Sequence, residues 1–194
     1  MTVKNNKGKV VPVRVYGDKC LRALSSKVDT IDSEILQIIA DLIETMYVKD
    51  GVGLAAPQIG KNLRIFVVDP QWFQTNERKP VVFINPKFIS LKGVETNDEG
   101  CLSLPDIFAE VPRAKEIIIE ANNEKGELVR YQAEGIFARA VQHEFDHLEG
   151  ILFIDRISKL TRIRLKLKLK NLERHTSVDG VNTDENLSDE TKYE

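Results

Sequence analysis

Cysteine is scarce in this sequence, which has 194 residues but only two cysteines, Cys20 and Cys101. Two cysteines do not form the disulfide framework that holds small secreted proteins together, so we expect a protein of a reducing compartment. The first residues, MTVKNNKGKVVPVRVYGD, contain no apolar run, which argues against a secretory signal. No stretch approaches the roughly 20 apolar residues that a membrane span needs. We therefore expect a cytoplasmic protein with no membrane partner.

The sequence also lacks a strong charge imbalance and the common nucleotide-binding motifs. A net charge of -2 neither indicates nor excludes a nucleic-acid surface, and the oligomeric state stays open. The glycines of 51–60 do not have the spacing of a dinucleotide-binding fingerprint, and no lysine follows them as in a phosphate loop. What remains is an ordinary globular composition, 42% hydrophobic and 30% charged. A chain of this length can form a core without disulfides.

Hydrophobic periodicity predicts a mixture of helices and strands. Apolar residues recur at helical spacing from about Asp32 to Val48, and the pattern ends at Asp50-Gly51. Runs rich in β-branched and aromatic residues predict strands, and the turn-forming NNEKG sequence joins the last two into a hairpin. The predicted strands are 11–16 (a weak edge strand), 63–69, 81–85, 117–121 and 128–133. Asn85-Pro86 is expected to end the strand at 81–85.

A second helix is predicted from 134 to 148, and it contains the sequence QHEFDH (142–147). His143 and His147 lie four residues apart, so they share one face of the helix, one turn apart. Two imidazoles in this arrangement can bind one metal ion, and the intervening Glu144 can act as a general base. The alternative is a pair of core histidines with protein partners, but the narrow pattern favours a metal. The helix is apolar over most of its circumference, which predicts a central, buried position.

The third metal ligand is not defined by this spacing. His175 borders a polar tail and Cys20 follows a turn in ordinary surface sequence, so neither is favoured. Cys101 lies in the glycine-flanked segment EGCLS (99–103), where its thiolate would complete a site suited to zinc, iron or cobalt. From the residues alone, Cys101 is equally a core cysteine, and the carboxylate of Glu99 is a further candidate ligand.

A glycine-rich segment, GVGLAAPQIG (51–60), is apolar where most loops are polar. Three glycines and a proline predict irregular backbone there. Such a segment either lines a pocket, because glycine lets the backbone run close to a ligand, or it is a tight connection between a helix and a strand. Both interpretations fit the residues equally well.

Three segments together, GVGLAAPQ (51–58), EGCLS (99–103) and QHEFDH (142–147), resemble the signature motifs of the peptide deformylase family, in the same order and with similar separations. The resemblance extends from about Val11 to Ile157. It implies an α+β fold, a single compact domain with mostly antiparallel twisted sheets packed around a central metal-binding helix, followed by a C-terminal helix. It also implies a metal-dependent hydrolase that removes the N-formyl group from the formyl-methionine of newly synthesised polypeptides and releases formate.

The resemblance further implies roles for the motif residues. One divalent ion, natively Fe(II) in many members of the family and often replaced by Zn, Ni or Co, would be bound. Its ligands would be Cys101, His143 and His147. Glu144 would act as general base and acid. Gln58 would donate its side-chain amide, and Leu102 its backbone N–H, to the developing oxyanion.

Substrate binding is expected from residues beside these motifs. The formyl group is small, so binding energy must come from the methionine side chain and the peptide backbone. Ile136 and Ala140 would line the methionine pocket with the apolar loop, while Val52 and Gly53 would offer backbone groups to an extended peptide. The full set of expected substrate-binding residues is Val52, Gly53, Glu99, Gly100, Ile136 and Ala140.

Two charged residues have alternative interpretations. Glu99 is either an anchor that pairs with Arg113 or a solvated loop residue. Asp146 either supports a metal ligand from behind or belongs to a structural ion pair. Both alternatives stay open at this point.

The chain ends in two segments of opposite charge. Residues 158–174 (SKLTRIRLKLKLKNLER) suit a helix by their Leu, Lys and Arg content, although the alternating apolar residues would also suit a strand. The basic face of such a helix is either solvated or in contact with ribosomal RNA, as some bacterial deformylases have it. Residues 176–194 are acidic and expected to be disordered. The expected organisation is a catalytic domain over 1–157, a basic helix over 158–175 and an acidic tail over 176–194.

Two other functions compete with deformylation. A zinc endopeptidase of the HExxH type usually takes a downstream His or Glu as its third ligand, and no suitable histidine follows His147. A non-catalytic metal module needs a fourth protein ligand, and nothing obvious in the sequence supplies one. Release of formate from a formyl-methionyl peptide, without cleavage of internal peptide bonds, separates deformylation from both.

Overall fold

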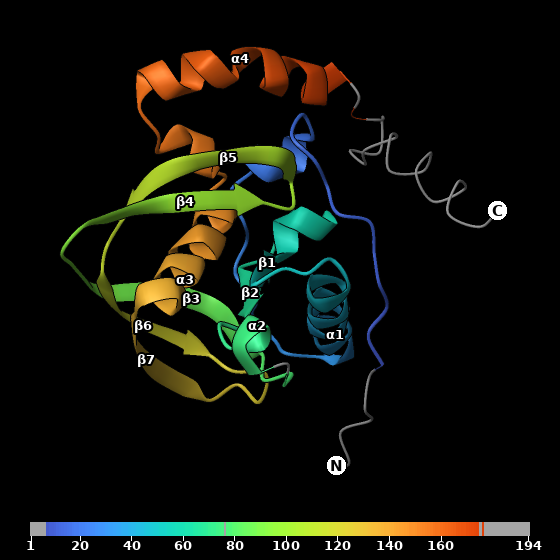
Figure 1. Cartoon of the computed structure of the whole chain (residues 1–194). Coiled ribbons are helices and arrows are strands. Elements are labelled where there is room, and N and C mark those ends of the chain that lie inside the picture. The colour runs from blue at the N-terminus through green and yellow to red at the C-terminus, as the bar shows by residue number, and fades with distance from the viewer. Residues whose placement is uncertain (1–6, 76, 175, 177–194) are drawn as a thin grey trace.

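A central helix, α3 (Gly135–Leu148), lies between two antiparallel sheets in the computed structural model (Figure 1). The structure describes residues 7–75, 77–174 and 176. One sheet has five strands in the order β1-β2-β3-β6-β7, and the other is the pair β4-β5. The strands are β1 (Gly53–Ala55), β2 (Ile65–Val68), β3 (Val81–Lys92), β4 (Glu95–Cys101), β5 (Leu104–Arg113), β6 (Glu116–Asn122) and β7 (Leu128–Glu134). The α+β architecture around a central helix is therefore confirmed.

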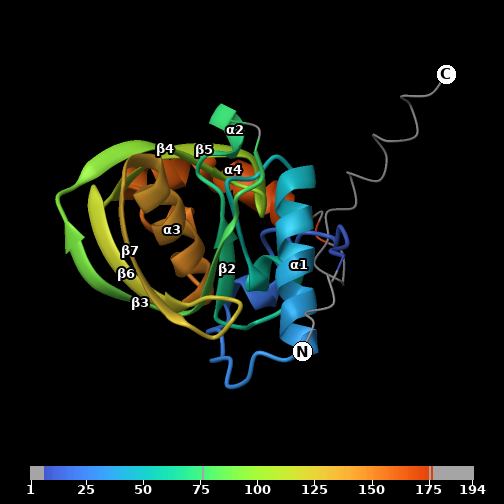
Figure 2. The same cartoon turned by 90° about the horizontal axis from the view of Figure 1, so that it is seen from below.

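Helix α3 is buried because both sheets pack on it. Figure 2 shows β3, β6 and β7 curving around one side of α3, with β4 and β5 crossing another. Ala138, Val141 and Leu148 have almost no exposed surface. The helix is followed by Gly150, whose φ of +67° is one that glycine adopts without strain. The predicted helix over 134–148 is confirmed.

Helix α1 (Ser33–Val48) covers the other side of β1 and β2. The Asp32 carboxylate caps it by accepting hydrogen bonds from the backbone N–H groups of Glu34 and Ile35, at 2.9 and 3.0 Å. Leu42 and Met46 on its apolar stripe are fully buried. The prediction from residue spacing is confirmed here as well.

Three local predictions are wrong. Strand β3 does not end at Asn85-Pro86; Asn85 takes a φ of +52° within a register shift, and its side chain bonds both the N–H and the C=O of Val28. Residues 11–16 form no strand, because Val11 N–H bonds the Thr45 hydroxyl and Arg14 N–H bonds the carbonyl of Gln58. The segment 51–60 is more regular than expected, since it contains β1 and the short helix η2 (Ala56–Ile59).

The remaining elements are short helices and the C-terminal helix. They are η1 (Lys19–Arg22), α2 (Trp72–Thr75), η3 (Phe153–Asp155) and α4 (Lys159–Arg174). Helix α4 lies across the outside of β5 and buries Leu169, which confirms a helix rather than a strand (Figure 1). Within the described residues, none of the helices is both long and apolar enough to cross a bilayer. The expected disorder of the acidic tail concerns residues outside the described part, apart from Thr176.

Candidate active site

Three potential metal ligands from distant parts of the sequence meet at one point. Cys101 ends β4, while His143 and His147 lie on successive turns of α3. One donor atom from each lies within 4.8 Å of the other two, and Cys101 Sγ is 3.3 Å from His147 Nε2. Both histidines are buried, with His143 9% and His147 1% exposed. The predicted ligand trio is thus brought together by the fold.

Glu99 orients one of these histidines from behind. Its carboxylate oxygen Oε2 lies 2.9 Å from His143 Nδ1. Burial alone would raise the pKa of Glu99, but hydrogen bonds from His143 and Arg113 hold that pKa well below its usual range. A carboxylate can only accept, so Nδ1 carries the proton and Nε2 is left for a metal.

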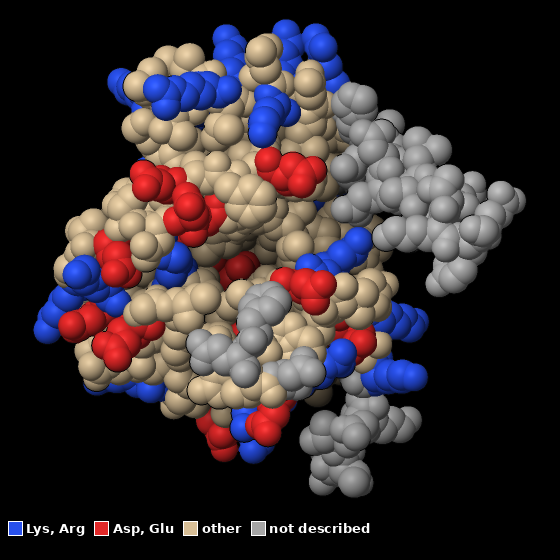
Figure 3. All heavy atoms as spheres, in the orientation of Figure 1, with Lys and Arg blue, Asp and Glu red and all other residues tan. Residues whose placement is uncertain are grey.

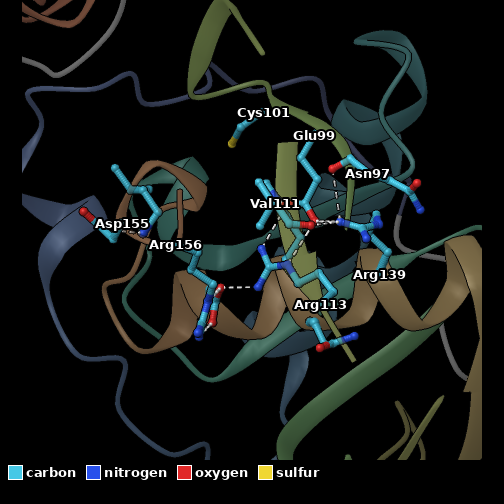
Figure 4. Close-up of polar contacts among 12 residues, drawn as sticks. Asn97, Glu99, Cys101, Val111, Arg113, Arg139, Asp155 and Arg156 are labelled. Carbon is cyan, nitrogen blue, oxygen red and sulfur yellow. Dashed lines mark hydrogen bonds and ion pairs between the residues drawn. The ribbon is translucent and has the colours of Figure 1, made fainter. Parts of the chain in front are cut away.

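Two arginines fix Glu99 in turn (Figure 4). Arg113 donates from Nε and Nη2 to the two Glu99 oxygens, both at 2.9 Å, so the expected pairing is present. Arg139 donates to Glu99 Oε1 at 2.7 Å and to the carbonyls of Glu95 and Val111, each at 2.9 Å. Because Arg139 belongs to α3 and its partners to β4 and β5, it ties the strand pair to the helix.

Arg113 also pairs with Asp146, which identifies Asp146 as part of a structural ion pair. Arg113 is 5% exposed, and its Nη1 donates to the Asp146 carboxylate, which also pairs with Arg156. Asp146 is therefore part of an ion-pair network, and it sits next to His147 on α3. Buried charges of this kind are tolerated only when every one is paired, so this network constrains the geometry around both histidines.

Gln58 is held so that its amide nitrogen faces the ligand trio. It is 2% exposed. Its Oε1 accepts a hydrogen bond from the backbone N–H of Ala55 at 2.8 Å. Its Nε2 lies 3.2 Å from Ser103 Oγ and 3.5 Å from Cys101 Sγ. Because the Ala55 N–H group already occupies Oε1, the orientation of the amide is fixed, and Nε2, its donor atom, points towards the three potential ligands.

Glu144 lies beside His143 and against the backbone of β1. It is 4% exposed, and burial raises its pKa to about 7. One oxygen, Oε2, has no hydrogen-bond partner among the described residues. A Cβ built on Gly53 would lie only 2.6 Å from Glu144 Oε1, so the position of this carboxylate requires glycine at 53. A carboxyl group with a pKa near neutrality can both take up and return a proton.

The site opens into a cavity of about 560 Å³. The space-filling view shows it as a hollow in the middle of one face, with acidic atoms at its floor (Figure 3). Every predicted site residue except His147 lines it. The predicted residues that do are Val52, Gly53, Gln58, Glu99, Gly100, Cys101, Leu102, Ile136, Ala140, His143 and Glu144. His147 reaches Cys101 through its Nε2, which is 3.3 Å from Sγ, and Leu102 lies in the turn between β4 and β5.

The donor set fits a divalent transition metal. One cysteine sulfur and two imidazoles would leave a fourth position open, as in catalytic rather than closed structural zinc sites, because no fourth protein ligand joins them among the described residues. Ligand atoms on one tetrahedral ion lie about 3.5 Å apart, close to the 3.3 Å between Cys101 and His147. His143 has the carboxylate partner that metal-binding histidines usually have.

Ser103, which does not line the cavity, and Arg139 and Phe108, which do, were not predicted from the sequence. Ser103 is fully buried and holds the Gln58 amide, yet a serine beside a cysteine carries no signal of that role. Arg139 precedes His143 by four residues, so its place on the same helix face was readable. Phe108 lines the cavity with 68% of its surface exposed, packed over Gly100, where a Cβ would approach its ring to 2.5 Å. The polar sequence of β4 concealed the strand that brings Gly100 there.

Known proteins resemble this chain over most of its length. Residues 10–163 match the family model of polypeptide deformylase. A curated peptide deformylase from Pseudothermotoga lettingae is 45% identical over 168 residues, which cover 86% of this chain and 94% of that protein. One from Neisseria meningitidis serogroup C is 44% identical over 161 residues, covering 83% and 95%.

Solved structures agree. A peptide deformylase from Legionella pneumophila superposes with a TM-score of 0.79 at 36% identity, covering 86% of this chain and 96% of that one. The enzyme from Thermotoga maritima has a TM-score of 0.72 at 45% identity, covering 77% and 99%. These matches confirm the resemblance seen in the three motifs. The chain therefore belongs to the peptide deformylase family, whose members are metal-dependent hydrolases that remove the N-formyl group from nascent polypeptides.

Proposed function

We propose that this chain carries out the reaction of its family in the cavity between β1, the β4-β5 pair and α3. The observation that carries the proposal is the trio of Cys101, His143 and His147, which opens past Glu144 and Gln58 into a cavity of about 560 Å³. The substrate is the N-formyl-methionyl end of a newly made polypeptide, and the products are formate and a free amino terminus. Because such chains are made in the cytoplasm, we place the reaction there.

The three ligands would hold one divalent ion, for which we propose Fe(II) as the native metal and Zn, Ni or Co as replacements. The mixed sulfur and nitrogen set suits these ions and disfavours Mg or Ca, which prefer oxygen ligands. When bound, such an ion supplies Lewis-acid chemistry, which acidifies water and polarises a carbonyl group. Metal analysis of freshly purified protein under anaerobic conditions tests the choice of Fe(II); a different ion at full occupancy would contradict it.

Glu144 would move the proton of the reaction. It takes a proton from the attacking water as the formyl carbon becomes tetrahedral, and it returns that proton to the leaving amine. Its burial and its raised pKa, about 7, suit both directions at neutral pH. The unpartnered Oε2 leaves one oxygen ready for this exchange.

Gln58 and Leu102 would stabilise the oxyanion that develops on the formyl oxygen. Gln58 Nε2 is preoriented because Ala55 N–H binds the other end of its amide, so little reorganisation is needed when the charge appears. The backbone N–H of Leu102, in the turn beside Cys101, would be the second donor. A neutral amide donates without adding a charge to the buried site.

The walls of the cavity support recognition of an N-terminal methionine. Ile136 and Ala140 present apolar surface from α3, and Ile136 is 54% exposed. Val52 and Gly53 bring the start of β1 to the cavity, where an extended peptide can add as a further strand. Gly100 contributes through Phe108, which lies over it. Glu99 would act indirectly, since its carboxylate already has partners on three residues.

Formate release from a formyl-methionyl peptide tests the proposal. Protein loaded anaerobically with Fe(II), or with Ni, is expected to release formate without cleaving internal peptide bonds. Glu144→Ala should keep its metal and lose nearly all activity. Glu149→Ala is the matched control, because that carboxylate lies at the end of the same helix and pairs with Arg64 at 2.7 Å, away from the cavity. Absence of formate release, or loss of metal from Glu144→Ala, contradicts the assignment.

We further propose that α4 contacts ribosomal RNA, so that the enzyme works near emerging chains. Its basic side chains are exposed along the helix, which supports contact with phosphates. This proposal keeps a catalytic domain over 1–157, a basic RNA-binding helix over 158–175 and an acidic tail over 176–194. A chain ending at Ser158 should lose salt-sensitive ribosome binding while a full chain keeps it, and equal binding would refute the contact.

A further inference from the structure

Helix α4 carries positive charge that the rest of the described chain leaves largely uncompensated. Its seven basic residues, all exposed, are Lys159, Arg162, Arg164, Lys166, Lys168, Lys170 and Arg174. Among the described residues, only Arg162 of these forms an ion pair, with Asp155 at 2.7 Å. Figure 3 shows this charge gathered over α4, whereas the face below it carries both acidic and basic residues.

A groove runs along one side of this helix. It has a volume of about 650 Å³ and is lined by Lys159, Arg162, Ile163, Lys166, Leu169 and Lys170 from α4, with Tyr16 and Glu173 near its end. Apolar surface adjoins it, because Leu160, Ile163 and Leu167 are at least 60% exposed. The groove thus offers ammonium and guanidinium groups beside aliphatic surface, which suits an acidic peptide with scattered apolar residues.

Such a peptide begins where the described chain ends. The hydroxyl of Thr176 lies 2.7 Å from the carbonyl oxygen of Tyr16, a residue of the groove, and 3.0 Å from that of Leu172. A Cβ on Gly17 would come within 3.0 Å of Thr176 Oγ1, so glycine permits this close approach. Thr176, the last described residue, therefore lies at the edge of the groove.

The segment from 177 to 194 has the length and the charge to occupy it. Its acidic residues are Asp179, Asp184, Glu185, Asp189, Glu190 and Glu194, against a single lysine, Lys192. It also contains Val181, Leu187 and Tyr193. Extended, it could span on the order of 60 Å, whereas α4 is only about 24 Å long.

We propose that the acidic segment 177–194 binds back along the basic groove of α4 and competes there with polyanions such as RNA. The contact is intramolecular, so its effective concentration is in the millimolar range for a short flexible connection. A contact too weak to detect between separate molecules then still occupies the groove. A polyanion that makes many contacts with α4 displaces the acidic segment. The segment therefore reduces the affinity of weakly bound polyanions more than that of tightly bound ones. This inference rests on the proposed RNA contact for its competition step alone.

The intramolecular contact is tested without RNA. Backbone amide NMR shifts of the full chain are compared with those of a chain that ends at Thr176. Shift differences spread along 159–170 are expected, and they should vanish in a full chain whose six acidic tail residues are replaced by Asn or Gln. Differences confined to 172–176 would overturn the inference, whatever RNA does.

Competition is tested by fluorescence anisotropy with labelled poly-uridine RNA. The shortened chain and the neutralised-tail chain should both bind roughly three- to tenfold more tightly than the full chain at low salt, and the difference should shrink as salt rises. Equal affinity of the full and neutralised-tail chains overturns competition.

The triple substitution Lys166→Gln/Lys168→Gln/Lys170→Gln in the shortened chain should abolish its gain in RNA affinity over the full chain. If it binds RNA unchanged, the proposed RNA contact of α4 fails, while the NMR comparison still decides the intramolecular one. Formate release should be equal in all of these chains, because α4 does not line the catalytic cavity.

Discussion

Replacing Gly53 with alanine should disable the enzyme without disturbing its metal. The new methyl group would lie 2.6 Å from Glu144 Oε1, 2.8 Å from its Cγ and 2.9 Å from its Cδ. Ordinary contact begins at about 3.4 Å, so the carboxylate must move by roughly 0.8 Å or the strand must shift. Displacing a reacting group by about 1 Å costs on the order of 100-fold in rate.

We therefore expect kcat for formyl-methionyl peptide hydrolysis to fall about 100-fold in Gly53→Ala, equivalent to about 2.7 kcal/mol. Metal content should stay unchanged, because the new methyl group meets only Glu144 among its nearest neighbours. The free energy of unfolding should fall by no more than about 1–3 kcal/mol, as is usual for one added methyl group in a packed site.

A double-variant cycle isolates the clash. In Glu144→Asp the side chain is one methylene shorter, so alanine at 53 has room. Adding Gly53→Ala to Glu144→Asp should cost less than about threefold, far from additive with its effect in the parent. Additive losses of activity in the double variant would refute a steric role for this glycine in positioning Glu144. A Gly53→Ala variant with an unchanged kcat and a raised KM would refute it as well.

Three further predictions address the rest of the site and its supports. Gln58→Leu should lower kcat by about 100- to 1000-fold with KM little changed, since it removes a donor needed mainly in the transition state; an effect on KM alone would argue against that role. Arg113→Met leaves two buried carboxylates short of a partner, and urea unfolding should show a loss of about 3–5 kcal/mol, whereas a neutral result would mean that the network adds nothing to stability. At Asp155, burial alone would raise the pKa, but hydrogen bonds from Arg22, the Leu152 N–H and Arg162 lower it below 3.8. A carboxyl group with a lowered folded pKa stabilises above its unfolded pKa, so Asp155→Asn should destabilise the protein at pH 6 and cease to differ from the parent as the pH falls through that lowered value; a difference that persists in acid would contradict this.

The helices were predictable because their signals are local. The apolar stripe of α1, its Asp32 cap and the histidine spacing in α3 all lie within one element. The motif residues were predictable for another reason. A resemblance to a family implies which distant residues meet, whereas hydrophobic periodicity reports only on one element at a time. Strand β4 was missed because its sequence is polar and mostly exposed, with no alternation to indicate a strand.

Long-range partners explain the other failures. The continuation of β3 past Asn85 depends on hydrogen bonds to Val28, a residue far away in the sequence. The role of Arg139 depends on carbonyls in β4 and β5, which the sequence does not bring together on its own. Ser103 likewise acquires its meaning only from Gln58. In each case one polar side chain completes hydrogen bonds for a distant segment, and no local pattern records the pairing.

The network around Arg113 joins the two units that carry the potential metal ligands, so we expect it to impose an order on folding. Cys101 belongs to the β4-β5 pair and the two histidines to α3, and Arg113 joins these units through Glu99 and Asp146. The ligand set cannot close until that docking is complete, which is a non-local and therefore slow step. Metal uptake should follow the last phase of refolding and never precede it, as stopped-flow mixing of refolding chain with Ni or Co would record. Before that docking, a partly made chain would present its thiol and its two imidazoles on separate units, without the complete ligand set.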